Sequence, residues 1–135
     1  MTSRKARPSD VADIALALPG VTHEPSWGDK PSFKVAGRAF VIYRGPRKDA
    51  LDADGHELQD VIVITCSADD KQSLVADDSP FFTTDHFNGY NAVLVRESQL
   101  PLLTRDELAE VITDGWLLRA PKKLSKPWLA ERGAD

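Results

Sequence analysis

The stretch from Phe33 to Tyr43 reads FKVAGRAFVIY, and it decides how the rest of the chain can fold. Apolar and polar residues alternate up to Val35, as in a half-buried strand. The run from Ala39 to Tyr43 is rich in the β-branched and aromatic residues that favour strands. Because Gly37 separates the two segments, the stretch predicts a β-hairpin.

The expected turn has two residues, Gly37 and Arg38, in a type II′ conformation. Glycine suits the turn position that requires a positive φ. The face of each strand then follows from the period of two along the chain. In this register Val35 pairs with Phe40 and Phe33 pairs with Ile42 on the core face, while Lys34 is exposed on the other face.

The segment 30 to 48, which contains this hairpin, is strongly basic. It holds six Lys or Arg residues and no Asp or Glu, although the whole chain has a formal charge of −4. The remainder therefore sums to −10, since −4 minus 6 is −10. A basic hairpin on an acidic body is typical of a nucleic-acid-binding wing. The alternative is that Lys and Arg on a strand edge only prevent aggregation between edges.

Length and composition indicate one α+β domain over residues 1–135, with a core at about 9–121 and a basic tail at 122–135. Hydrophobic residues make up 41% and charged residues 28% of the chain, as in ordinary globular proteins. A bilayer span needs about 18 to 20 apolar residues, and no segment provides them. The N-terminus also lacks the apolar core of a signal peptide. We therefore expect a cytoplasmic protein without a membrane partner.

Local signals outside the hairpin predict three helices and two further strands. Ser9 and Ser67 are N-cap residues, and Thr104 with Glu107 forms a capping box. Segment 21–31 is expected to be irregular, because it contains Pro25, Gly28 and Pro31. The order α-β-β-β-α-β-α predicts an antiparallel sheet covered by helices. The helices are expected at 10–18, at 68–77 and from Thr104 to Pro121, and the strands at 61–66 and 91–96.

Neither a metal site nor an enzyme motif is evident. The three histidines are widely separated and Cys66 is the single cysteine, so the spacing of a zinc site is missing. The acidic run from Asp52 to Gly55 lacks the further ligand spacing of an EF-hand loop. Phosphate-binding loops and nucleophile elbows are also missing. The sequence therefore predicts a non-enzymatic protein with no cofactor and no metal.

An aromatic segment supports a different function. Residues 81–90 contain four aromatic side chains and a histidine, more than a plain connection requires. Some of these side chains are expected to fill the core. The others form a candidate groove of mixed aromatic and polar character, which suits a protein or small-ligand partner. The groove residues are Trp27, Phe82, His86, Asn88 and Tyr90.

Several motifs in a fixed order resemble the MmcQ/YjbR family of small bacterial proteins. They are ALALPGV at 15–21, Trp27-Gly28, PSFKVAGRAF at 31–40, HFNGY at 86–90, Trp116 and Ala120-Pro121-Lys122. The resemblance implies an α+β fold like the double-wing, MotA-like DNA-binding domain, with a broader likeness to frataxin-like and secretion-chaperone-like folds. The acidic segment near 47–60 departs from the family pattern, and it opposes DNA binding if it folds over the basic hairpin.

Two functions therefore remain open from the sequence. In the first, the protein binds DNA, with Trp27 or Tyr90 meeting bases or sugars. In the second, it binds a protein or a small ligand in the aromatic groove and does not bind DNA. For the first function, the expected phosphate contacts are Lys30, Lys34, Arg38, Arg44, Lys122, Lys123 and Lys126.

Overall fold

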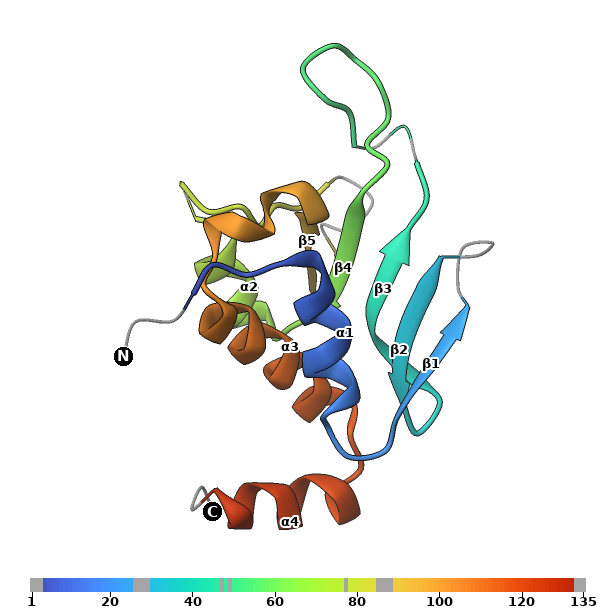
Figure 1. The fold of residues 1–135 in the computed structure, drawn as a ribbon, viewed down its shortest axis with the longest axis vertical. Coiled ribbons are helices and arrows are strands. Elements are labelled where there is room, and N and C mark those ends of the chain that lie inside the picture. Colours follow the sequence, from blue (N-terminus) through green and yellow to red (C-terminus); the bar gives the residue numbers. More distant parts are fainter. Residues whose placement is uncertain are drawn as a thin grey trace.

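A five-stranded antiparallel sheet forms the centre of the fold in the computed structural model (Figure 1). The strands follow one another in the order β1-β2-β3-β4-β5, so each strand pairs with its neighbour in the sequence. They are β1 (Val21–Pro25), β2 (Pro31–Val35), β3 (Arg38–Arg44), β4 (Val61–Thr65) and β5 (Ala92–Arg96). The structure describes residues 4–25, 30–46, 48, 50–76, 78–84 and 89–132.

Helices lie against one face of this sheet, so the predicted α+β class with an antiparallel sheet is confirmed. The predicted N-cap at Ser9 is wrong: α1 begins at Pro8 with Arg7 as its N-cap residue, because Asp10 accepts from the Arg7 amide. The predicted caps at Ser67 and at Thr104 with Glu107 are confirmed. The helices are α1 (Pro8–Leu16), α2 (Ala68–Leu74), the 3-10 helix η2 (Glu97–Leu102), α3 (Arg105–Arg119) and α4 (Lys122–Glu131).

Two segments for which the sequence predicts no helix or strand are regular in the structure. Residues 21–25 form the edge strand β1, where Pro25 at the strand end costs no ladder hydrogen bond inside the sheet. Most of the expected basic tail is the helix α4. Trp128 of α4 packs against Trp116 with a ring distance of 5.3 Å. Leu124 and Trp128 pack against the main core and stabilise this helix, whose sequence is otherwise mostly polar.

The turn of the β2–β3 hairpin differs from the prediction. The turn residues are Ala36 and Gly37, which both have positive φ, at 52° and 77°. Two positive φ values define a type I′ turn, whose twist matches that of a hairpin. As a result, Val35 pairs with Arg38 and not with Phe40. The expected type II′ turn at Gly37-Arg38 is wrong by one residue.

A β-bulge at Phe40 then restores most of the predicted core face. Phe33 pairs with Val41 and Lys34 pairs with Ala39, which leaves Phe40 as an extra residue in β3. The predicted pair of Phe33 with Ile42 is therefore wrong, and Ile42 packs against the smaller apolar cluster on the other face. Phe40 and Val41 are consecutive, yet both are fully buried in the main core. Phe33 and Val35 are buried as predicted, and Lys34 is half-buried on the other face.

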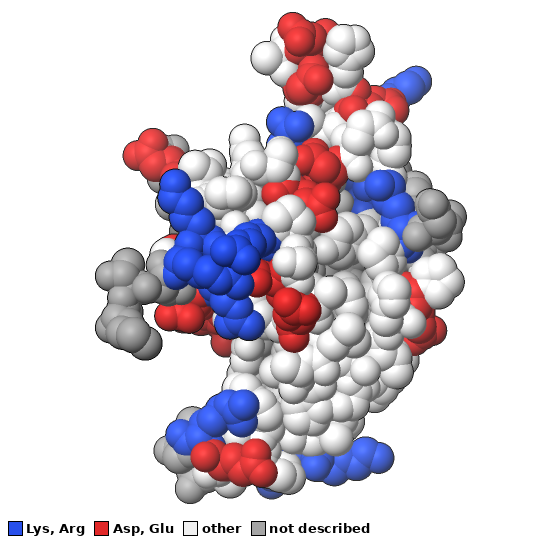
Figure 2. Space-filling model, viewed as in Figure 1, with Lys and Arg blue, Asp and Glu red and all other residues white. Residues whose placement is uncertain are grey.

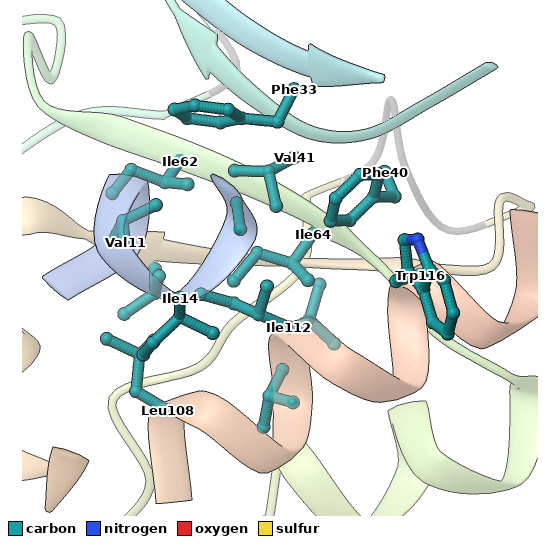
Figure 3. Packing of buried hydrophobic residues seen from close by; sticks show 14 of the residues in the cluster. Val11, Ile14, Phe33, Phe40, Val41, Ile62, Ile64, Leu108, Ile112 and Trp116 are labelled. Carbon is teal, nitrogen blue, oxygen red and sulfur yellow. The ribbon is translucent and has the colours of Figure 1, made fainter. Parts of the chain in front are cut away.

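The main core lies between the sheet and the helices α1 and α3. Figure 3 shows Val11 and Ile14 from α1 meeting side chains from α3 beneath the strands β2, β3 and β4. Trp116 is fully buried, and its indole Nε1 donates to the carbonyl oxygen of Pro19 at 3.0 Å. That hydrogen bond satisfies the polar atom of the largest core side chain.

A smaller apolar cluster covers the opposite face of the sheet. Its buried members include Val61 of β4, and also Ala50 and Leu58. Ala50 and Leu58 lie at the two ends of the loop formed by the acidic segment near 47–60, which we call the acidic loop. Figure 1 shows the rest of this loop, drawn in green, extending beyond the end of the sheet. The loop is therefore anchored through its base, while its acidic tip faces solvent.

Candidate nucleic-acid interface

The predicted basic hairpin is divided between two ends of the sheet. The strand β3 runs from the exposed Arg38 beside the turn to Arg44 beside the acidic loop. Seven extended residues span about 20 Å. This length exceeds the Debye length of about 8 Å at physiological ionic strength, so charges at the two ends are largely screened from each other. Among the described basic residues of segment 30–48, Arg38 and Arg44 therefore belong to separate ends of the sheet.

Three of the predicted phosphate contacts have other surroundings. Arg44 is only 2% exposed, beside the smaller apolar cluster, so its guanidinium does not face solvent. Lys34 lies 3.9 Å from a carboxylate oxygen of Glu24 on the neighbouring strand. The ammonium of Lys30 donates to the carbonyl oxygen of Gln59 at 3.3 Å. The prediction that Arg44 contacts phosphate is wrong, because the residue is buried in the fold.

The other four predicted contacts lie on two segments that meet at Gly20. Gly20 has a positive φ of 72°, and a Cβ at this position would lie 2.8 Å from Leu124 and 3.8 Å from Val35. Since Leu124 is the third residue of α4 and Val35 pairs with Arg38, the hairpin turn and the start of α4 are neighbours. Arg38, Lys122, Lys123 and Lys126 are all exposed, and we call them the hairpin–α4 surface.

The positive charges of the hairpin–α4 surface are not neutralised by ion pairs with described residues. Within the described ranges, none of its four side chains takes part in an ion pair. The first turn of α4 contains no acidic residue, and its backbone N–H groups add a partial positive charge. The acidic loop begins at the opposite end of β3, so it does not cover Arg38.

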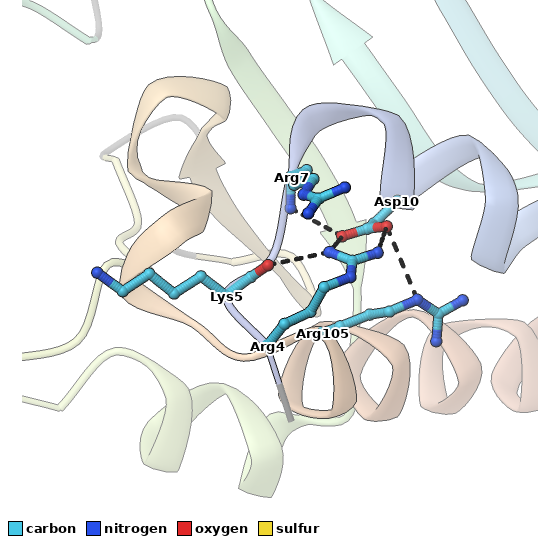
Figure 4. Close-up of polar contacts among 5 residues, drawn as sticks. All are labelled: Arg4, Lys5, Arg7, Asp10 and Arg105. Atoms are coloured by element: carbon cyan, nitrogen blue, oxygen red, sulfur yellow. Dashed lines mark hydrogen bonds and ion pairs between the residues drawn. The ribbon is translucent and has the colours of Figure 1, made fainter. Parts of the chain in front are cut away.

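The sequence interpretation missed a second basic cluster, at the start of α1. Figure 2 shows Lys and Arg side chains gathered on this face of the molecule. Figure 4 shows Arg4, Arg7 and Arg105 close to Asp10, while the Lys5 side chain points away and the Lys5 carbonyl oxygen accepts from Arg4. Arg4 donates two hydrogen bonds to Asp10, at 2.7 and 2.8 Å, and Arg105 lies 3.7 Å from the same carboxylate.

Asp10 gives this cluster a structural role. Its side chain is 2% exposed, and it also accepts from the Arg7 amide at 2.8 Å, which caps α1. The hydrogen bonds from Arg4 lower the pKa of Asp10 to about 2, with further contributions from the Arg7 amide and Arg105. An acidic residue near a helix N-terminus is a signal visible in the sequence, whereas its pairing with Arg105 of α3 depends on the fold.

The structure describes only two residues of the predicted aromatic groove, Phe82 and Tyr90. Trp27, His86 and Asn88 lie outside the described residues. Phe82 packs on the smaller apolar cluster and lines a cavity beside the acidic loop. Tyr90 is 60% exposed and does not line that cavity. The described members therefore do not form a shared pocket.

The acidic loop contains one group of side chains with the potential to hold a metal ion. Ligand atoms of Asp52, Asp54 and His56 lie within 4.8 Å of one another. However, the carboxylate of Asp52 already accepts from the amides of Asp54 and His56, both at 2.9 Å. These bonds lower the pKa of Asp52 and hold the turn. The group is therefore explained by the local structure of the loop, and the predicted lack of a metal stays a prediction.

Comparison with known proteins identifies the family. The model of the YjbR family matches residues 16–118, which include the whole sheet and most of α3. The chain belongs to the YjbR family. This confirms the resemblance found in the sequence motifs, but it does not by itself assign DNA binding to this member.

Curated relatives of this YjbR family member come from mycobacteria. The uncharacterized protein Rv2570 of Mycobacterium tuberculosis (strain H37Rv) is 37% identical over 132 residues, which cover 92% of this chain and 96% of the relative. The uncharacterized protein Mb2600 of Mycobacterium bovis matches with the same identity and coverage. Among the described residues, no helix is both long and apolar enough to cross a bilayer.

Proposed function

We propose that this YjbR family member is a non-enzymatic protein that binds the phosphate backbone of DNA through the hairpin–α4 surface. One observation carries the proposal: the hairpin and α4, which are far apart in the sequence, meet at Gly20, and they carry four exposed cations for which the described part of the chain offers no ion-pair partner. Phosphate contacts from Lys and Arg supply most of the affinity of sequence-independent DNA binding.

The geometry of the surface favours backbone contacts over base contacts. The cations are placed on a hairpin turn and on the first turns of a helix that also packs against the core through Trp128. Since Lys contacts phosphate as a point charge, the surface offers little to read a base sequence. Weak sequence preference and a strong dependence on salt are therefore expected.

Local charge matters more than net charge for this interaction. The chain as a whole is acidic, with a net charge of −4. Its acidic loop is about 20 Å from Arg38 along β3, well beyond the Debye length at physiological salt. The repulsion between this loop and a bound duplex is consequently small. Deletion of residues 49–58 would not test this repulsion cleanly, because it would also remove Ala50 and Leu58 from the smaller apolar cluster.

A salt titration of duplex binding tests the proposal. Fluorescence anisotropy with a random labelled duplex measures the binding constant between about 50 and 200 mM salt. If all four cations contact phosphate, the logarithm of the binding constant should fall with the logarithm of the salt concentration at a slope of about −3.6, because each neutralised phosphate contributes about −0.9.

A charge-matched pair of variants locates the binding surface. Arg38→Ala with Lys123→Ala removes two charges from the hairpin–α4 surface, and we expect the slope to lose about two units. Lys5→Ala with Lys48→Ala removes two exposed charges elsewhere and should leave the slope unchanged. Equal losses in both variants would contradict the proposed surface. A lack of binding by the intact protein at 50 mM salt would contradict DNA binding itself.

A further inference from the structure

A second surface has the opposite charge. A groove with a cavity volume of about 520 Å³ lies beside α2 and α3, away from the hairpin–α4 surface. Its floor is apolar and includes Leu74, Phe81 and Val111, of which Phe81 and Val111 are buried. A volume of this size lies within the range of small-ligand sites. We call it the acidic groove, because its rim is formed by Asp70, Asp78, Glu107, Glu110 and Asp114.

No described residue that lines the acidic groove is a Lys or Arg. The nearby Lys71 donates to the carbonyl oxygen of Tyr90 at 2.6 Å and is not among the lining residues. Burial raises the pKa of Asp114, and the negative charges of Asp70 and Glu110 raise it further. The groove thus keeps like charges close together, and a bound cation would relieve their repulsion.

The spacing of the carboxylates favours an extended cation over a single metal ion. Glu107, Glu110 and Asp114 occupy positions i, i+3 and i+7 on one face of α3, so they extend over about 10 Å of helix at 1.5 Å per residue. Glu107 also accepts from the Thr104 amide as part of the capping box. Among the described residues, the ligand atoms that lie within 4.8 Å of one another belong to Asp52, Asp54 and His56, and not to the carboxylates of the acidic groove.

We propose that the acidic groove binds a linear polyamine. Several ammonium groups separated by methylene segments match carboxylates that are distributed along a helix face above an apolar floor. The ammonium groups pair with Asp70, Glu110 and Asp114, while the methylene segments lie against Leu74, Phe81 and Val111. This site is independent of the proposed DNA-binding surface, since it uses a different part of the fold.

Calorimetric titration of the full chain with spermidine at low salt tests the proposal. Two paired exposed carboxylate contacts are together worth about tenfold in affinity, so Glu110→Gln with Asp114→Asn should weaken binding about tenfold. The control Asp54→Asn with Glu57→Gln removes the same charge from the acidic loop and should change affinity less than about twofold. Thermal melting of both variants checks that they fold, and the groove variant should melt no lower than the parent because it removes repulsion.

Two further measurements separate a built site from diffuse attraction. Amide NMR shifts on spermidine addition should concentrate in residues 66–81 and 102–114, and magnesium chloride at equal ionic strength should displace spermidine only weakly. The proposal would be overturned by an equal loss of affinity in the two variants or by shifts spread over the acidic loop. It would also be overturned if magnesium at equal ionic strength displaced spermidine completely.

Discussion

Replacement of Asp10 by Asn should destabilise the fold in a pH-dependent manner. Asn has nearly the same shape and still accepts from the Arg7 amide, so the change removes mainly the charge that faces Arg4 and Arg105. The pKa of Asp10 is lowered from 3.8 to about 2. This difference corresponds to at most about 2.5 kcal/mol. The Arg4 side chain is 42% exposed, so solvent screening reduces the expected loss to about 1 to 2 kcal/mol at pH 7.

The sign of the pH dependence follows from the direction of this pKa shift. A carboxyl whose pKa is lower in the folded state stabilises the fold above the unfolded pKa of about 4. That stabilisation is lost as the pH falls from about 4 to about 2, where the folded state also takes up the proton. Asp10→Asn should therefore differ from the parent at pH 7 and approach it near pH 2.

Urea unfolding followed by circular dichroism at pH 7, 4 and 2.5 measures the free energy of unfolding. Asp13→Asn is the matched control, because Asp13 is exposed on the same helix and carries the same charge. It should change stability by less than about 0.5 kcal/mol. The reasoning is refuted if Asp10→Asn is as stable as the parent at pH 7, or if its deficit is the same at every pH.

Two further changes test the packing of the fold. Gly115→Ala should gain up to about 1 kcal/mol in helix propensity, but its Cβ would lie 2.7 Å from the backbone oxygen of Thr65 on β4, and such overpacking costs about 1 to 3 kcal/mol. We expect net destabilisation in urea unfolding, against a near-neutral Gly89→Ala control that meets no atom within 4 Å; a stabilised Gly115→Ala would contradict the close contact. Phe40→Ala should lose about 3 to 5 kcal/mol, because the bulge buries Phe40 completely. A loss below about 1 kcal/mol would show that the bulge does not direct this side chain into the core.

Local patterns were sufficient for much of the fold. The caps at Ser67 and at Thr104 with Glu107, and the apolar strand near 61–66, depend on residues only a few positions apart. Such interactions are decided by backbone geometry and by neighbouring side chains, so they can be predicted from the sequence. The α+β class followed from the order of these elements.

The register of the hairpin required the tertiary structure. Gly37 marked a turn, but two adjacent turns were compatible with the same residues. The fold selects the turn at Ala36-Gly37 and compensates with a bulge, because this arrangement buries Phe40 and Val41 together beneath the helices. Burial of both side chains outweighs the regular alternation of a strand.

The candidate sites were decided almost wholly by the fold. The sequence determined that segment 30–48 is basic, but the extended strand separates its charges, and packing buries Arg44. Only the contact of Gly20 with Leu124 brings α4 beside the hairpin turn, and only the packing of α3 against α1 brings Arg105 to Asp10. A sequence determines which charges a segment carries, whereas the direction and burial of each side chain depend on contacts between segments that are distant along the chain.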